Sequence, residues 1–263
     1  MKIKEILAAL ERFAPLPLQD GFDNAGLQVG LTEAEATGAL LCLDVTEAVI
    51  DEAIALGYNL VVSHHPLIFK GYKSITGKDY VERCIMKAIR NDIVVYSAHT
   101  NLDNAEGGVN FKIAEKIGLK NVQVLEPKQD AGEDVVAGAG VVGELEEPET
   151  ETDFLKRIKK LFEVGCVKHN RMNGRLIRKV ALCGGSGAFL LPRAVACNAD
   201  VFITGEVKYH DYFFYDNRIL VAEIGHYESE QYTKEIFYSI IREMFPELDV
   251  QMTRVNTNPI KYL

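Results

Sequence analysis

The chain has 263 residues, of which 48% are hydrophobic and 25% charged, and this composition is typical of a globular protein with one large domain or two smaller ones. Its formal net charge of −9 disfavours a dedicated binder of nucleic acids or of anionic membranes, because such proteins carry basic surfaces. The five cysteines are odd in number and show no CxxC spacing, so we expect buried thiols in a reducing compartment, the cytoplasm.

The N-terminal segment has the pattern of an amphipathic helix. Ile3, Ile6, Leu7 and Leu10 recur at helical spacing, and Glu5 interrupts the apolar run that an export signal would need. No stretch of about 18 uninterrupted apolar residues occurs, so no membrane-spanning helix is expected. We therefore predict a soluble chain whose first helix packs on the rest of the protein.

Short apolar runs alternate with helical patterns from residue 39 onward. The predicted strands are residues 39–45, 59–63, 93–97 and 122–125, and the predicted helices are residues 46–56, 80–90 and 109–117. Thr46 is the expected N-cap of the first of these helices, and Gly57 its expected end. Strands that alternate with helices predict α/β domains with mainly parallel sheets that helices cover.

The composition changes near residue 127, where Gly, Ala, Val, Asp and Glu become frequent. We predict a first α/β domain at residues 1–127 and a second at residues 128–263, whose last helix and strand can pack back on the first. The strand–helix pattern resumes after a predicted helix at residues 152–162. The order of elements then repeats that of the first half, which predicts an internal duplication, with generic similarity of βαβ units as the alternative.

A duplication would make the strand ends of the two halves counterparts about a pseudo-twofold axis. Open α/β sheets bind ligands at the carboxyl ends of their strands. Side chains from both halves are therefore expected to meet in one cleft.

Two adjacent histidines, His64 and His65, end the predicted strand at residues 59–63. Successive side chains of a strand point to opposite faces, so both can bind one metal ion only if the backbone turns, which Pro66 favours. Otherwise each histidine serves a different ion. An ordinary polar strand end is the alternative without metal.

Two further segments place metal-binding residue types after predicted strands. His99 and Asp103 follow one strand, although Asp103 could also serve as a turn or capping residue. His226 and Glu230 follow another, and their spacing of four puts them on one face if a helix begins there. The alternative role of Glu230 is to offset the dipole of that helix.

The predicted topology brings these strand ends together, so the separate signals reinforce one another. Histidine and carboxylate ligands suit Zn, Mn, Fe, Co or Ni, and a bridging carboxylate suits two divalent ions. No cysteine belongs to the set, which favours a site with open positions for water or substrate over a closed structural zinc site.

Two other segments of the second half could take part in binding. Residues 183–187, Cys-Gly-Gly-Ser-Gly, could cradle an anion at a helix start, but they lack the lysine of a P-loop, and a close-packed turn is favoured. Glu206, Lys208 and His210 follow the predicted strand at residues 201–203 and could act on protons or substrate charge, or be solvated loop residues.

Six motifs occur in order along the chain. They are residues 21–30, residues 63–67, residues 99–103 with 107–110, residues 184–187, residues 199–205 with 208–210, and residues 225–230. Together they resemble the NIF-three-like family, whose members are often named GTP cyclohydrolase 1 type 2. The resemblance covers essentially the whole chain and implies a two-domain α/β subunit, a hexameric ring and two divalent metal ions.

The metal ligands that this resemblance implies are His64, His65, Asp103, His226 and Glu230. Glu230 is also the expected bridge between the ions and a catalytic residue, and the other candidate catalytic residues are His210 and Glu206. The chain departs from the family at two positions, since Phe22 stands where a Trp is usual and Glu206 where an Asp is common. It resembles the short form without a central inserted domain.

We expect a metal-dependent hydrolase that acts on a small, nucleotide-like substrate, with GTP as the candidate that the family name supplies. The GTP reaction would open the purine ring by hydrolysis and release formate. The alternative from another class is a non-catalytic metal-binding or regulatory adaptor protein. The resemblance alone implies the homohexamer, and neither a membrane nor a nucleic acid is an expected partner.

Overall fold

The computed structural model describes residues 1–129 and 135–263 and divides the chain into two compact units. Unit 1 contains Met1–Leu102 and Thr233–Lys261, and unit 2 contains Asp103–Tyr232 and Tyr262–Leu263. The division differs from the predicted boundary between residues 127 and 128, because the chain enters the second unit about one helix and one strand earlier. The last helix and strand belong to unit 1, as the sequence allowed.

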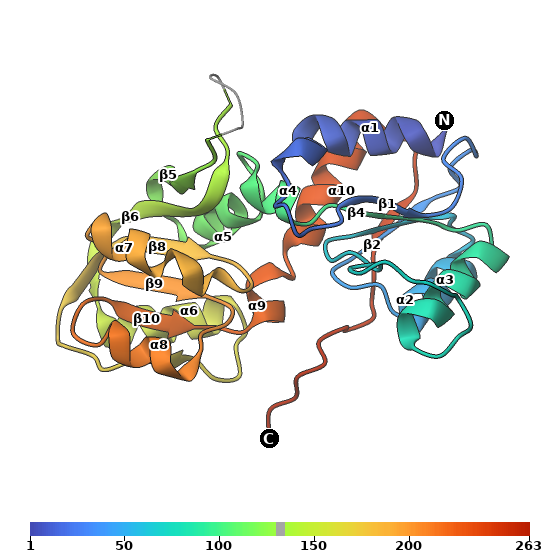
Figure 1. The fold of residues 1–263 in the computed structure, drawn as a ribbon. Coiled ribbons are helices and arrows are strands. Elements are labelled where there is room, and N and C mark those ends of the chain that lie inside the picture. The colour runs from blue at the N-terminus through green and yellow to red at the C-terminus, as the bar shows by residue number, and fades with distance from the viewer. Residues whose placement is uncertain (130–134) are drawn as a thin grey trace. The chain divides into compact units, whose positions relative to one another are not determined.

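Unit 1 is a five-stranded sheet with helices on both faces (Figure 1). Across the sheet, the strands are β1 (Gly26–Val29), β4 (Val94–Ser97), β3 (Leu60–Ser63), β2 (Ala39–Cys42) and β11 (Val250–Met252). Strand β1 is antiparallel to β4, and the other neighbouring pairs are parallel. The helices are α1 (Ile3–Phe13), η1 (Leu16–Leu18), α2 (Glu47–Leu56), α3 (Tyr80–Arg90) and α10 (Thr233–Met244), and α4 (Thr100–Asn104) starts in this unit.

The central strands of unit 1 are apolar because helices cover both of their faces. Every residue of β2, β3 and β4 is buried. Leu40, Val61 and Val95 share a core cluster with Val49 of α2 and Cys84 of α3. Helices α1 and α10 pack together on the opposite face (Figure 1). This confirms the predicted parallel sheet for unit 1.

Unit 2 is a mixed sheet of six strands. Across the sheet, they are β5 (Lys120–Pro127), β6 (Gly138–Thr150), β8 (Leu176–Cys183), β9 (Val201–Thr204), β10 (Leu220–Glu223) and β7 (Lys168–His169). The pairs β8–β9 and β9–β10 are parallel and the other three antiparallel, because the long strand β6 runs antiparallel to both β5 and β8, and β7 runs antiparallel to β10. The helices are α5 (Val109–Ile117), α6 (Glu151–Leu161), η2 (Gly187–Leu190), α7 (Leu191–Ala196), α8 (Tyr209–Phe214) and α9 (His226–Glu230).

The two sheets repeat one arrangement of four strands. The order β1-β4-β3-β2 in unit 1 corresponds to β7-β10-β9-β8 in unit 2, and in both the first strand is antiparallel and the other three are parallel. The duplication hypothesis predicts this agreement. In this correspondence, the end of β4, near His99, is the counterpart of the end of β10, near His226.

Several helix boundaries follow the local signals in the sequence. The hydroxyl oxygen of Thr46 accepts a hydrogen bond from Val49 N, and Gly57 ends α2 with a φ of 72°, as predicted. No helix within residues 1–129 and 135–263 is long and apolar enough to cross a membrane. All five cysteines are free thiols. Cys42, Cys84 and Cys183 are buried as expected, whereas Cys166 is exposed, so the expectation of buried thiols is wrong for Cys166.

Glu82 anchors the loop that precedes α3. It accepts hydrogen bonds from the backbone N–H groups of Lys78 at 3.0 Å and Thr76 at 2.7 Å, which favour the ionised form and lower its pKa from 4.5 to about 2. A carboxyl group with a lowered folded-state pKa contributes stability that is present at neutral pH and is lost as the pH falls from about 4.5 towards about 2.

We therefore expect Glu82→Gln to lower the urea midpoint of unfolding at neutral pH. At about pH 3 the same change should lower the midpoint less. Urea titrations of both proteins at the two pH values measure this difference. An equal loss at both pH values would contradict the assigned pKa.

Candidate metal centre

Three histidines form a cluster at the carboxyl ends of two neighbouring strands of unit 1. His64 and His65 follow β3, His99 follows β4, and one candidate ligand nitrogen from each lies within 4.8 Å of the others. The ring centroids of His64 and His65 are 4.9 Å apart, and that of His99 lies 5.3 Å and 5.5 Å from them. They meet because parallel strands end at the same edge of the sheet.

The backbone bends at His64 and His65, which lets two adjacent side chains face one site. The hydroxyl oxygens of Ser63 and Ser97 lie 2.9 Å and 3.2 Å from the carbonyl oxygen of His65 and hold this bend. His64 is fully buried, and its Nδ1 donates to the carbonyl oxygen of Ala98 at 2.9 Å. The turn expected at the histidine pair is confirmed.

Two carboxylates hold the other two rings of the cluster. His65 Nδ1 lies 2.7 Å from Asp44 Oδ1, and His99 Nδ1 lies 2.8 Å from Asp23 Oδ1. Burial raises the pKa of both carboxyls, but the hydrogen bonds and charge of the facing histidines, together with hydrogen bonds from Thr257 to Asp44 and from Thr100 to Asp23, outweigh it. The pKa of Asp44 is therefore lowered, and that of Asp23 falls to about 2. Carboxylate–histidine pairs of this kind fix the orientation of metal-binding rings.

Sequence reasoning left three members of this arrangement out of the predicted site. His99 was part of a motif but not of the expected ligand set, and neither Asp23 nor Asp44 was singled out. Asp23 is 76 residues from His99 in the sequence, and Asp44 is 21 residues from His65. Spacing cannot reveal such pairs, and for Asp23 the one available signal was its place in the motif at residues 21–30.

Unit 2 holds a second cluster, which contains Asp103, His226 and Glu230. His226 Nε2 and Glu230 Oε2 are 3.1 Å apart across one turn of α9, as their spacing predicted. Carboxylate oxygens of Asp103 and Glu230 lie within 4.8 Å of each other. His226 corresponds in position to His99, and Glu230 to Asp103, since each acid follows its histidine by four residues.

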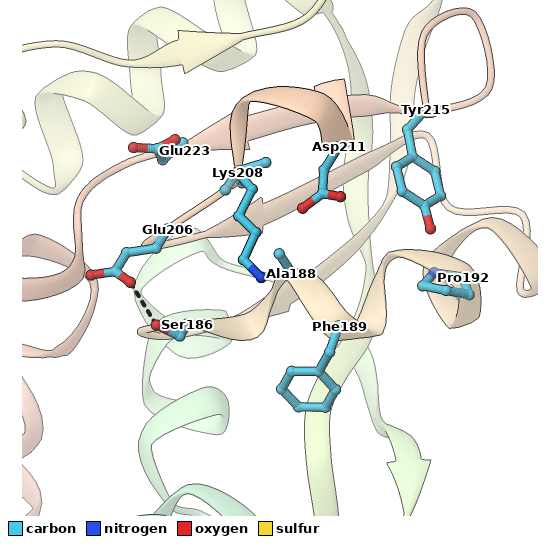
Figure 2. A pocket seen from close by; sticks show the side chains of 10 residues that line it. Ser186, Ala188, Phe189, Pro192, Glu206, Lys208, Asp211, Tyr215 and Glu223 are labelled. Atoms are coloured by element: carbon cyan, nitrogen blue, oxygen red, sulfur yellow. Dashed lines mark hydrogen bonds between the residues drawn. The ribbon is translucent and has the colours of Figure 1, made fainter. Parts of the chain in front are cut away.

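Glu206 holds the His226 ring in the way that the aspartates hold their histidines. Its Oε1 lies 3.0 Å from His226 Nδ1, and its Oε2 accepts a hydrogen bond from Ser186 Oγ at 2.7 Å (Figure 2). The hydrogen bonds from Ser186 and His226 lower the pKa of Glu206. Glu206 and Ser186 also line a cavity of about 720 Å³, which Lys208 and Asp211 line as well. Glu206 is thus placed to orient the His226 ring, and its role as a catalytic residue stays a prediction.

His210, a candidate catalytic residue, is exposed on α8. Its ring centroid lies 5.4 Å from that of Tyr209 and 6.5 Å from that of Phe213. Within the described parts of the chain, its ring forms no hydrogen bond and does not line the cavity beside Glu206. A role for His210 in turnover stays a prediction.

The glycine-rich turn at residues 184–187 is close-packed, as the sequence favoured. The backbone N–H groups of Gly184, Gly185 and Gly187 donate to Asn110 Oδ1, Ser229 Oγ and Thr204 Oγ1. These amides are therefore occupied by protein side chains and do not form an anion cradle. A Cβ on Gly185, whose φ is +57°, would lie 2.3 Å from Glu230 Oε1 and 3.2 Å from His226 Nε2, so this glycine makes room for the cluster of unit 2.

The donor atoms of the two clusters fit divalent transition-metal ions. Unit 1 offers three imidazoles, and unit 2 offers one imidazole and two carboxylates. None of these six side chains is a thiol, and such N/O sets suit catalytic or exchangeable metal sites better than closed structural zinc sites. Each ring also has the orienting partner that metal-binding histidines need.

Comparison with known proteins agrees with the resemblance seen in the motifs. The profile of the Duf34/NIF3 family (NGG1p interacting factor 3) matches residues 1–259. A Clostridium perfringens protein named GTP cyclohydrolase 1 type 2 homolog is 37% identical over 231 residues, which cover 88% of this chain and 87% of that protein. Solved structures of a Staphylococcus aureus hypothetical protein (30% identical) and a Bacillus cereus protein related to NIF3 (25% identical) both give a TM-score of 0.91 and cover 100% of this chain and 99% of theirs. The chain thus belongs to the Duf34/NIF3 family.

Proposed function

We propose that this protein is a hydrolase that uses two divalent metal ions and acts on a small, nucleotide-like substrate. The observation that carries the proposal is that four histidine rings are oriented by the same kind of hydrogen bond. In His64, His65, His99 and His226, Nδ1 is bonded to a carbonyl or carboxylate oxygen of the same unit. Nε2 would then be the nitrogen that binds a metal ion, and proteins orient metal-binding histidines in this way.

The ligands that we propose for the two ions come from both units. They are His64, His65, Asp103, His226 and Glu230. Glu230 is the proposed bridge, because its two oxygens can serve two ions. A divalent ion held by these residues would supply Lewis-acid activation of water or of a substrate oxygen, and Zn, Mn, Fe, Co and Ni all suit this donor set.

The name of the relatives makes GTP the first substrate to test. That reaction would open the purine ring by hydrolysis and release formate. A protein that binds ions without turning over any substrate would instead fit the alternative function, a metal-binding or regulatory adaptor.

The proposed function can be tested with protein loaded separately with Mn, Zn, Fe or Co. Each preparation is assayed with GTP, other nucleotides and phosphoesters. We expect turnover that disappears in His64→Ala, because this change removes a ligand from the most buried part of the cluster. Tight metal binding without turnover of any of these substrates would contradict the hydrolase and favour the adaptor.

Asp44 should control metal affinity through His65 without contacting the ion. We expect Asp44→Asn to weaken binding of Zn²⁺ or Mn²⁺ about 10–100-fold, the usual effect of removing an orienting carboxylate. Asp51→Asn is the matched control, since Asp51 is exposed and pairs with Lys87. Isothermal titration calorimetry measures the metal affinity of each variant. Equal affinities in Asp44→Asn and Asp51→Asn would count against the role of Asp44.

We further propose that the chain assembles into a homohexamer, as the family resemblance implies. Light scattering at micromolar concentration measures the mass directly. A monomer at every concentration tested would contradict this assembly.

A further inference from the structure

Two exposed aromatic rings lie beside the histidine cluster of unit 1. Phe22 is 67% exposed and Phe69 is 47% exposed, and their ring centroids are 6.4 Å apart. The Phe69 ring also meets the His99 ring edge to face at 5.9 Å. Contiguous exposed apolar side chains next to candidate ligands mark a surface that binds another molecule.

The two loops that carry these rings are bonded to each other. Asn24 Nδ2 donates to the carbonyl oxygen of Ile68 at 2.6 Å, and the N–H of Ile68 donates to Gln28 Oε1 at 3.1 Å. Asp23, which follows Phe22, is bonded to the histidine cluster. These hydrogen bonds hold the two segments that carry the rings, so binding would cost little ordering of the loops.

The segment that follows the second ring is basic. Residues 66–78 contain Lys70, Lys73 and Lys78 and no Asp or Glu, although the whole chain has a net charge of −9. All three lysines are exposed. Such a segment suits the phosphate groups of a small anion, for which lysine is a common binding residue.

We infer that Phe22 and Phe69 bind the base of a nucleotide and that Lys70 and Lys73 bind its phosphates. This inference rests on the proposed function and names the substrate class of that site. Aromatic side chains stack on any nucleobase through its π face. Because Phe69 touches His99, the base and not the phosphate chain lies next to the histidine cluster. The reaction that fits this arrangement is hydrolysis within the heteroaromatic ring, not hydrolysis of a phosphoester.

Fluorescence can report base stacking, because the chain contains no Trp. Phe22→Trp places a single Trp in the aromatic pair, and Phe13→Trp places one at the end of α1 as a control. In metal-loaded protein, we expect GTP and GMP to quench the emission of Phe22→Trp to saturation and to leave Phe13→Trp unchanged after correction for absorbance. Ribose 5-phosphate, which has no base, should quench neither.

Two further variants separate base binding from phosphate binding. Phe69→Leu keeps an apolar side chain but removes the ring, and we expect it to raise the Kd of GTP about tenfold, with Phe13→Leu as the unaffected control. Lys70→Gln should raise the Kd of GTP and leave the Kd of guanosine unchanged, because guanosine has no phosphate. Calorimetry measures these constants without requiring turnover.

The outcomes for the inference and for the proposed function are distinct. An unchanged Kd of GTP in Phe69→Leu, or no binding of any nucleotide by the metal-loaded native protein, would overturn the inference. Binding that depends on Phe69 without turnover would uphold the inference and contradict the hydrolase. If Phe69→Leu turns over GTP with native Kd and KM, the hydrolase is upheld and the inference is contradicted.

Discussion

Replacing Glu230 by Gln is expected to lower the occupancy of at least one metal ion and to abolish hydrolysis, while the fold stays intact. The change keeps the shape of a buried side chain but removes the charge that a bridging ligand needs. Asp103 and His226 cannot take its place, because both are proposed as ligands in their own right. Metal analysis by mass spectrometry, circular dichroism and the activity assay measure the three parts of this prediction.

His210→Ala is the companion variant, because His210 is a candidate catalytic residue outside the ligand set. We expect it to retain both metals and to affect only turnover. Full occupancy of both sites in Glu230→Gln would refute the bridging role. Loss of metal in His210→Ala would mean that the ligand set is wrong.

Gly185→Ala should weaken metal binding without removing any ligand. The new Cβ would lie 2.3 Å from Glu230 Oε1, so Glu230 would have to move away from its neighbour His226. The backbone at Gly185 has a φ of +57°, and a side chain in this conformation costs about 1–2 kcal/mol of folding stability as well.

A second glycine separates these two effects. Gly174 has a φ of +72°, and a Cβ there would have nothing within 4 Å. Gly174→Ala should therefore lose a similar amount of stability, about 1–2 kcal/mol, and keep native metal affinity. Equal metal affinities in Gly174→Ala and Gly185→Ala, measured by calorimetry, would show that Glu230 does not depend on this space.

Much of the fold could be predicted because local signals were strong. Helix α3 was predicted at its observed limits, and α2 within one residue, since capping residues and apolar periodicity agreed. Strand β6 was not predicted, because its sequence is rich in Gly and Glu and its partner β8 is distant in the sequence. A helix begins at His226, as the spacing of His226 and Glu230 allowed, but it ends at Glu230, and α10 starts at Thr233, where the chain passes into unit 1.

The site could be predicted only in part, for a related reason. His64, His226 and Glu230 stood out because their residue types occur directly after predicted strands. The contact between Asp23 and His99 depends on how the chain folds back on itself, and so does that between Glu206 and Ser186, which are 20 residues apart. Residue type and spacing therefore indicate candidate ligands, but they do not indicate the residues that orient them.

The metal content of the native protein tests the central claim most directly. The protein would be loaded with Mn²⁺ or Zn²⁺, dialysed and analysed for bound metal per chain, beside His64→Ala treated in the same way. We predict two ions per native chain and fewer in the variant. A native protein that retains no metal, or a variant that retains as much as the native chain, would contradict the dinuclear centre.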